Sequence, residues 1–317
     1  MYFSIITSQI LILALLAIVG VVATKLKVIT EQVKNSIASL VFNITLPFLI
    51  ITSVSHVEIN KEILNNSILV FILSSVGITL LYFIGRASGF LLNLETKKRN
   101  IHLLHTMFGN VAFLGYPLFS ALFPGGEGLL YAIIYHLTQD VFIWTIGVFV
   151  FNSNKKVKFS ENLKHLLNPN TVSFTLGAIM LLLGIQFPDY IYKPFYGLGQ
   201  TTIYIAMLYI GAVLAQNPMM KAFKKPEIYA LSFNKMIFVP FLLLLIIQIL
   251  TKFTGIHIGE IAKTVVVMQS GMPCMTLIVV LAKKFDSDDL HATENLFLST
   301  ILSLGTLPLI YLLIQYF

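Results

Sequence analysis

The fold of this chain is decided by two interrupted apolar stretches, GNVAFLGYPL at residues 109–118 and QSGMP at residues 269–273. Proline lacks an amide proton and clashes with the preceding helical turn, so we expect a broken helix at each stretch. At membrane depth, the freed backbone groups must find partners inside the protein. Pro117 and Pro273 lie 156 residues apart, close to half of the 317-residue chain. Paired broken helices at corresponding positions of two halves indicate the binding site of a transporter.

The composition places the chain in a lipid bilayer. It is 57% hydrophobic and 11% charged, with a mean hydropathy of +0.86, which excludes both a soluble domain and a disordered chain. The formal charge of +7 comes from Lys and Arg in short clusters between apolar stretches, so we expect these residues to set the topology and expect no nucleic acid partner. The single cysteine, Cys274, excludes an intramolecular disulfide and a metal site built on cysteines.

Apolar stretches of about 20 residues, the length that crosses a bilayer, occur ten times. The longest connection between them, residues 152–170, carries four lysines and separates a first five-helix repeat (1–151) from a second (171–317). The sequence therefore predicts an all-α integral membrane protein with ten transmembrane helices. The spans lie near residues 4–24, 31–54, 64–86, 101–123, 128–151, 171–187, 194–216, 228–251, 260–282 and 291–316.

The basic residues fall on alternate connections, which predicts that these connections are cytoplasmic and that both termini are extracytoplasmic. With five spans per half, the second half enters the membrane from the opposite side, so we expect two inverted repeats with the fourth and ninth spans broken and crossed. The residues that set this orientation are Lys25, Lys27, Lys34, Arg86, Lys97, Lys98, Arg99, Lys155, Lys156, Lys158, Lys164, Lys221, Lys224, Lys225, Lys283 and Lys284.

The two breaks are the predicted substrate site. Crossed antiparallel, they would bring together the N-terminal ends of their second halves, which carry partial positive charge and free amides and so favour an anion. Asn110 adds a side-chain amide at the fourth span, and Gln269 and Ser270 add polar groups at the ninth. These groups have an alternative role, because side chains at a break often only satisfy the freed backbone carbonyls.

The second span carries Asn43 four residues before Pro47. Proline at this spacing kinks the helix and frees the carbonyl of Asn43. The pair has two interpretations of equal weight, a kink alone or a kinked wall that shapes the substrate cavity.

Ionisable groups inside spans are costly and indicate function. The fifth span presents His136, Gln139 and Asp140, with His136 and Asp140 one turn apart on one helix face, which makes the three candidates for ion or proton coupling. Glu294 and Lys235 lie near the predicted cytoplasmic ends of their spans, where the sequence favours structural roles. His102 and His105 are interpreted in the same way, as an interfacial pair rather than a metal site.

The sequence holds no catalytic or nucleotide-binding motif, so we expect neither an enzyme nor a bound cofactor. Without an ATP-binding module, transport must run on an ion gradient, the membrane potential or the gradient of the substrate itself. Uniport, proton coupling through Asp140 and sodium coupling through oxygen ligands at the break all remain open.

The fourth-span string Asn110-Val-Ala-Phe-Leu-Gly115-Tyr-Pro117-Leu118 resembles the N-x-x-x-x-G-x-P-L crossover of the auxin efflux carrier family. This family includes the plant PIN-FORMED auxin carriers and bacterial permeases for malate or malonate. The resemblance extends along nearly the whole chain. It includes Leu46-Pro47, the stretch from Ala206-Met207 to Gly211, and the C-terminal residues Ser299-Thr300, Gly305, Leu307-Pro308 and Tyr311.

The resemblance implies a sodium/proton antiporter-like fold with a scaffold of spans one, two, six and seven, and a transport domain of spans three to five and eight to ten. It also implies an elevator movement, the possibility of a homodimer as in the plant members, and a carboxylate substrate at the crossing of spans four and nine. On matching positions, Asn110, Gly115 and Pro117 would line the site, with Gly271 and Pro273 opposite. The QSGMP string and the short central connection separate this chain from plant members.

The main hypothesis is therefore a secondary transporter of a small organic anion that works by alternating access. One alternative is a sensor or receptor that keeps the fold and binds a ligand without transporting it. Another is a cation/proton antiporter with the same crossed helices, which would need paired acidic residues near the crossing, whereas the sequence offers Asp140 alone.

Overall fold

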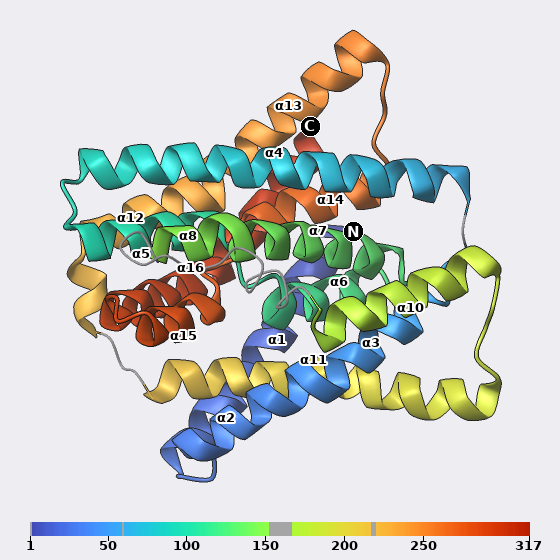
Figure 1. The fold of residues 1–317 in the computed structure, drawn as a ribbon, viewed down its shortest axis with the longest axis horizontal. Helices are drawn as coiled ribbons and strands as arrows, with labels where there is room; N and C mark the ends of the chain where they lie inside the picture. The colour runs from blue at the N-terminus through green and yellow to red at the C-terminus, as the bar shows by residue number, and fades with distance from the viewer. Residues whose placement is uncertain (1, 59, 152–166, 217–219) are drawn as a thin grey trace. The chain divides into compact units, whose positions relative to one another are not determined.

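The computed structural model is all-helical and describes residues 2–58, 60–151, 167–216 and 220–317 (Figure 1). The lysines of the predicted linker, Lys155, Lys156, Lys158 and Lys164, lie outside these residues. The helices are α1 (Tyr2–Lys25), α2 (Glu31–Leu40), α3 (Leu46–Val54), α4 (Lys61–Leu91), α5 (Thr96–Met107), α6 (Tyr116–Leu122), α7 (Glu127–Phe142), α8 (Val148–Phe151), α10 (Pro169–Leu183), α11 (Asp189–Gln216), α12 (Pro226–Phe233), α13 (Val239–Thr254), α14 (Glu260–Ser270), α15 (Thr276–Lys284) and α16 (Asp289–Tyr316).

Short tighter or wider helical turns join several of these helices into longer ones. Four are π-helical, η1 (Val41–Thr45), η2 (Val111–Gly115), η3 (Ile143–Gly147) and η6 (Asn234–Phe238), and one is a 3₁₀ turn, η5 (Met220–Lys224). The turn η1 lies directly before Pro47, which is the second residue of α3. A π-turn provides the backbone slack that a proline needs, so the second span continues through Pro47 without a break.

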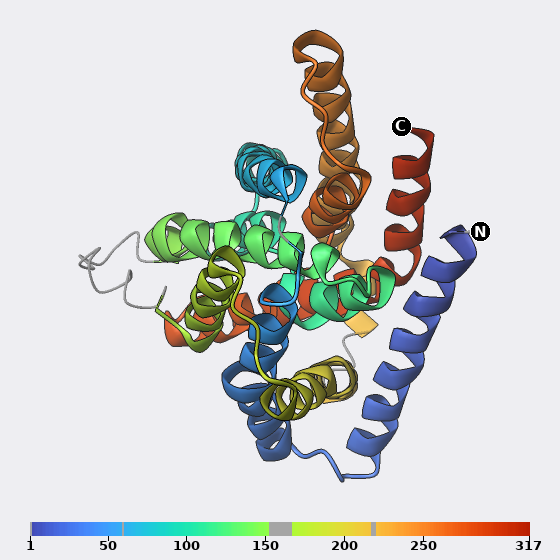
Figure 2. The same cartoon turned by 90° about the vertical axis from the view of Figure 1, so that its right-hand side faces the viewer.

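Among the described residues, seven helical segments are long and apolar enough to cross a membrane. They match seven of the ten predicted spans, and Figures 1 and 2 show the longest of them, α4, from the side and end-on. The sixth predicted span corresponds to α10, which has 15 residues, and the fourth and ninth are interrupted helices. The chain is thus a multi-pass membrane protein, while the ten crossings and their inverted repeat stay predictions.

The chain packs as two compact units. Unit 1 comprises Met1–Ser67, Ala112–Ile134 and Leu167–Pro218, and unit 2 comprises Ile68–Val111, Tyr135–Leu166 and Met219–Phe317. Each unit combines segments from both halves of the sequence. The second half of the fourth span, α6, belongs to unit 1, whereas its first half, α5, belongs to unit 2.

In unit 1, α1 packs closely against α11, and α3 packs against α10 and α11. Two glycines allow the first contact, because a Cβ at Gly20 would meet the backbone of Leu208 and one at Gly211 would meet the backbone of Ala17. Small residues let helix backbones approach in this way in membranes, where lipid removes most of the hydrophobic driving force.

We expect Gly211→Ala to lower the thermal stability of the protein in detergent, because the added methyl group forces α1 and α11 apart. Overpacking of this kind costs about 1–3 kcal/mol. The matched control is Gly197→Ala on the same helix, where a Cβ would meet nothing within 4 Å. Equal melting temperatures for the two variants would show that the close approach does not stabilise the unit.

Unit 2 is organised around α16, which packs against α5, α12, α14 and α15. The apolar core of unit 2 contains residues from α4, α5, α15, α16 and η3, which pack around the end of α5. This core therefore supports the point where the fourth span is interrupted. The core residues are Ile78, Ile101, Leu103, Leu104, Met107, Phe108, Ile143, Ile278, Leu281, Ala282 and Ala292.

Candidate functional site

The two predicted breaks meet inside unit 2. The first half of the fourth span ends at Met107 and helical structure resumes at Val111, while the first half of the ninth ends at Ser270 and α15 begins at Thr276. The non-helical residues pair as a short antiparallel bridge between Gly109 and Cys274. We call residues 108–110 and 272–275 the crossing.

Backbone hydrogen bonds hold the crossing together. The Asn110 amide donates to the Pro273 carbonyl at 2.7 Å, and the Met275 amide donates to the Phe108 carbonyl at 3.2 Å. Gly109 permits the close approach, because a Cβ there would lie 3.1 Å from the Cβ of Met272. Each break thus supplies the partners that the other lacks, as irregular backbone at membrane depth requires.

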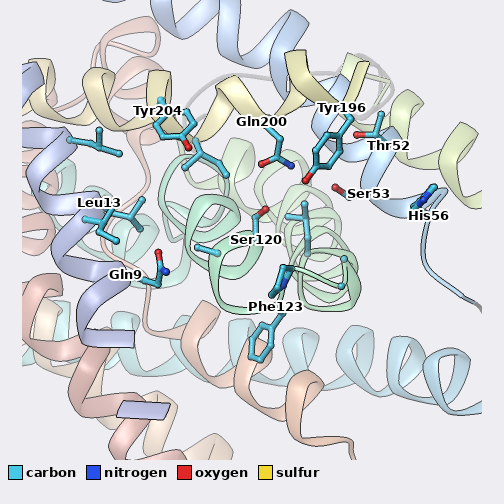
Figure 3. Close-up of a pocket in the computed structure, with 18 of the residues that line it drawn as sticks. Gln9, Leu13, Thr52, Ser53, His56, Ser120, Phe123, Tyr196, Gln200 and Tyr204 are labelled. Carbon is cyan, nitrogen blue, oxygen red and sulfur yellow. The ribbon is translucent and has the colours of Figure 1, made fainter. Parts of the chain in front are cut away.

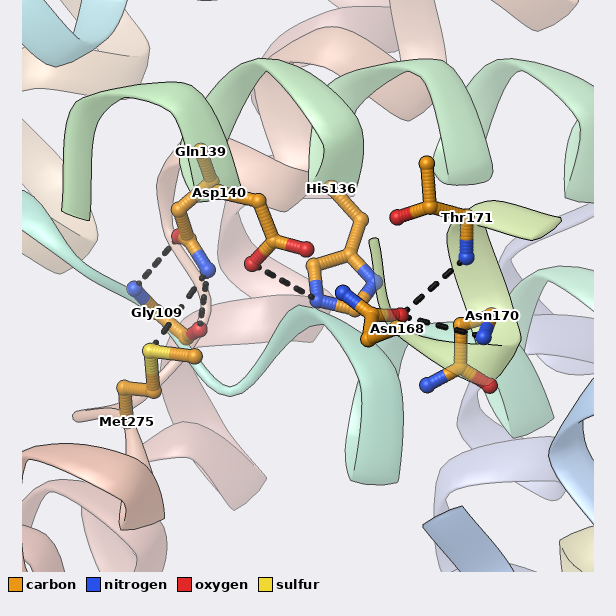
Figure 4. A network of polar contacts seen from close by, with 8 residues as sticks. All are labelled: Gly109, His136, Gln139, Asp140, Asn168, Asn170, Thr171 and Met275. Carbon is orange, nitrogen blue, oxygen red and sulfur yellow. Dashed lines mark hydrogen bonds and ion pairs between the residues drawn. The ribbon is translucent and has the colours of Figure 1, made fainter. Parts of the chain in front are cut away.

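Gln139 on α7 completes this pairing (Figure 4). Its Oε1 accepts from the Gly109 amide at 2.9 Å, and its Nε2 donates to the Gly109 carbonyl at 3.1 Å. The side chain is fully buried, and Nε2 also approaches the sulfur of Met275 at 3.7 Å. Both ends of the amide therefore hold the break in place, a role that the sequence did not predict.

His136 and Asp140 form the pair that their spacing predicted. The Nε2 of His136 lies 3.5 Å from Oδ1 of Asp140, and both side chains are buried (Figure 4). They lie on the same helix as Gln139, so the crossing and the pair share one rigid support. Their role in ion or proton coupling stays a prediction.

The polar residues of the ninth span differ in how their side chains are used. The Ser270 hydroxyl donates to the Val267 carbonyl of its own helix at 2.7 Å. The amide of Gln269 is buried, and neither its oxygen nor its nitrogen has a hydrogen-bond partner among the described residues. Gly271 is closely packed, because a Cβ there would meet Ile310 and Pro240. Gln269 is thus the polar group at this break that is available to a ligand.

The remaining predicted site residues belong to unit 1. Asn43 is exposed, and its amide donates to the carbonyl and hydroxyl of Ser39 at 3.0 and 3.1 Å. Gly115 ends η2, and Pro117 is the buried second residue of α6. Pro117 therefore lies inside the helix that follows the break, and the interruption itself falls at residues 108–110.

The sequence favoured a structural role for Lys235, with its ammonium reaching the interface, and the burial of the side chain contradicts that reach. The side chain is 1% exposed, and its ammonium donates to the Thr106 carbonyl at 3.0 Å, close to the C-terminal end of α5. A Cβ at Gly109 would lie 3.6 Å from the Cε of Lys235, so the lysine stands directly beside the crossing. The depth of Lys235 could have been predicted from the sequence. Lys235 lies nine residues after Pro226, which corresponds to about 14 Å along a helix and is too far from the helix start for an interfacial position.

Glu294 is also buried, at 3% exposure, and forms an ion pair with Lys225. Its sequence position indicated the interface, whereas the structure places it under the start of α12. The partner Lys225 is partly exposed and follows the exposed Lys221 and Lys224 of η5, and we call these three lysines the basic edge of unit 2.

Unit 1 contains a separate cavity of about 520 Å³ (Figure 3). Amide, hydroxyl and imidazole groups face it together with apolar side chains, and its described lining includes no Asp, Glu, Lys or Arg. A space of this size admits a small organic molecule. Neutral hydrogen-bonding groups therefore provide the polar part of this lining. The polar lining residues include Gln9, Thr52, Ser53, His56, Ser120, Tyr196, Gln200 and Tyr204.

Comparison with known proteins identifies the family. The model of the membrane transport protein family matches residues 5–311, nearly the whole chain. The chain belongs to this family. The match confirms the resemblance to the auxin efflux carriers and makes the protein a membrane transporter rather than an enzyme.

Two relatives are similar along their whole length. An uncharacterized transporter of Methanothermobacter thermautotrophicus is 25% identical over 306 residues, which cover 96% of each chain. An uncharacterized transporter of Methanocaldococcus jannaschii is 25% identical over 315 residues, covering 95% of this chain and 96% of the relative.

Proposed function

We propose that this transporter is a secondary carrier of a small organic anion that binds at the crossing through its carboxylate. The observation that carries the proposal is the buried ammonium of Lys235 beside the crossing. Within the described residues, no Asp or Glu forms an ion pair with it. A buried charge is costly without compensation, and an anionic substrate supplies it.

The backbone adds to this preference. Both second halves begin at the crossing, η2 at Val111 and α15 at Thr276, and no described side chain caps α15. Helix N-terminal ends carry partial positive charge and free amides, which suit a carboxylate. The buried carboxylate of Asp140 contacts the imidazole of His136, whereas the ammonium of Lys235 stands directly beside the crossing, which supports an anion over the cation that an antiporter would carry.

We further propose that the anion crosses by alternating access of the elevator type. The test is uptake of labelled malate, malonate and indole acetate into proteoliposomes, with a pH gradient, a sodium gradient and a membrane potential imposed separately. Saturable uptake of one of these acids supports the carrier. Binding of an acid without flux would instead support the sensor.

We expect Asn110→Ala to weaken uptake of the transported acid, raising KM about tenfold, the effect of one lost hydrogen bond to a charged group. The backbone amide that bonds to Pro273 is unchanged, so the crossing stays intact. Asn65→Ala, on an exposed face of α4, is the control. A folded Asn110→Ala variant with the wild-type KM would remove Asn110 from the site.

A further inference from the structure

Unit 2 contains a row of buried polar side chains that leads away from the crossing along two packed helices, α5 and α16. Neither the anion site nor the pairing of the breaks needs most of these groups. We call the row the polar column. It consists of the buried side chains of His102, His105, His291, Asn295 and Ser299, together with the half-buried Ser88 of the neighbouring α4.

The α5 side of the polar column reaches the crossing through histidines. His102 and His105 are three residues apart, so they share one face of the helix. The Nε2 of His102 lies 2.8 Å from the hydroxyl of Ser88 on α4, and the Nε2 of His105 lies 3.2 Å from the carbonyl of Met275. Both imidazoles are fully buried inside unit 2, and their interfacial position stays a prediction.

The second side of the polar column lies on α16. His291, Asn295 and Ser299 recur every four residues, and the Ser299 hydroxyl accepts from the Cys274 amide of the crossing at 3.0 Å. The eight residues from His291 to Ser299 span about 12 Å. The helices α5 and α16 pack against each other, so the two sides of the polar column are neighbours.

The far end of the polar column reaches the basic edge of unit 2. Nδ1 of His291 lies 3.7 Å from Oε2 of Glu294, which pairs with the partly exposed Lys225. The basic residues predict that this edge is cytoplasmic. The charged groups that act on the three imidazoles are Lys225, Glu227, Lys235, Asp288 and Glu294.

Six polar atoms of the column have no hydrogen-bond partner among the described residues. They are Nδ1 of His102 and His105, both ring nitrogens of His291, and both amide atoms of Asn295. Buried polar atoms are almost always hydrogen-bonded, either to protein or to internal water. Six such atoms on two packed helices therefore provide hydrogen-bonding positions that internal water would satisfy along the polar column.

We propose that the polar column conducts protons between the aqueous edge of unit 2 and the crossing, so that the anion crosses together with a proton. This inference rests on the proposed carrier function. Each imidazole takes up a proton on one ring nitrogen and releases one from the other, which leaves the ring in its other tautomer. A ring flip or a return exchange of protons with water restores the first tautomer before the next proton passes. The proton leaves water at the edge and offsets the charge of the anion at the crossing.

The test uses proteoliposomes of the full chain with an internal pH-sensitive dye and labelled malonate. Uptake down a malonate gradient alone, with the potential clamped, reports the carrier, whereas accumulation driven by a pH gradient reports coupling. We expect His105→Gln to keep the uptake that runs down the malonate gradient. The accumulation driven by the pH gradient should fall at least about tenfold, the size of effect typical for a removed proton-transfer group. Glutamine still reaches the Met275 carbonyl, so the fold is retained.

His102→Gln and His291→Gln should lose coupling in the same way, and exposed His257→Gln should not. Accumulation at the wild-type level in all three column variants would overturn the proton pathway. If wild-type protein takes up none of malate, malonate and indole acetate, the carrier proposal fails. Hydroxyl-radical footprinting then tests independently whether water enters the polar column. Oxidation of buried His105 and Cys274 supports internal water, and protection of both overturns it.

Discussion

Replacing Gln139 by leucine is expected to abolish transport and to lower thermal stability more than any other single change at the crossing. Leucine leaves the amide and the carbonyl of Gly109 without the bonds that Gln139 provides at 2.9 and 3.1 Å. An unsatisfied buried polar group costs about 1–3 kcal/mol, so two cost roughly 2–6 kcal/mol. The bridge to Cys274 would then open or shift. Thermal unfolding in detergent and uptake in proteoliposomes measure the two effects.

Two variants separate this effect from the loss of an amide in general. Gln248→Leu removes an exposed glutamine of α13 and should change neither measurement. Gln139→Glu can bond to both Gly109 groups only as the neutral acid, which accepts from the amide and donates to the carbonyl, so we expect its stability to fall as rising pH ionises the acid. A Gln139→Leu protein with wild-type stability and uptake would show that the crossing is held by its own backbone bonds alone.

The breaks were predictable because glycine and proline act on the backbone locally. Gly109, Gly271 and Pro273 lie in or beside the interruptions, and their antiparallel pairing follows from the need to satisfy freed backbone groups. The sequence also predicted a break at Pro117, and this is wrong. The π-turn η2 directly precedes α6 and provides the backbone slack that a proline needs, so the helix continues through Pro117 and the break lies before it.

Tertiary partners were not predictable in the same way. The four-residue spacing in the fifth span correctly predicted the contact between His136 and Asp140, because both residues lie on one helix. The contact from Gln139 to Gly109 joins residues 30 positions apart, and no local pattern records it. Likewise, the burial of His105 depends on α16, which is contributed by the other half of the sequence.

Replacing Lys235 by methionine is expected to have the second largest effect, a loss of affinity for the transported anion of about 10- to 100-fold. Methionine fills a similar volume and removes the ammonium that stands beside the crossing. Exchange of a buried ion for an apolar side chain is often neutral for folding. The unpaired Thr106 carbonyl adds a cost of about 1 kcal/mol. Affinity should therefore fall much more than stability, which KM for malonate or malate and the melting temperature compare directly.

Lys252→Met, near the end of α13 and exposed, is the matched control and should keep the wild-type KM. The contrast with Gln139→Leu is informative, since that variant loses the geometry of the crossing whereas Lys235→Met loses its charge. If folded Lys235→Met protein transports an organic anion with unchanged KM, the ammonium serves only to cap the carbonyl end of α5. Anion selection would then rest on Asn110 and the helix ends, and uptake by Asn110→Ala would decide between them.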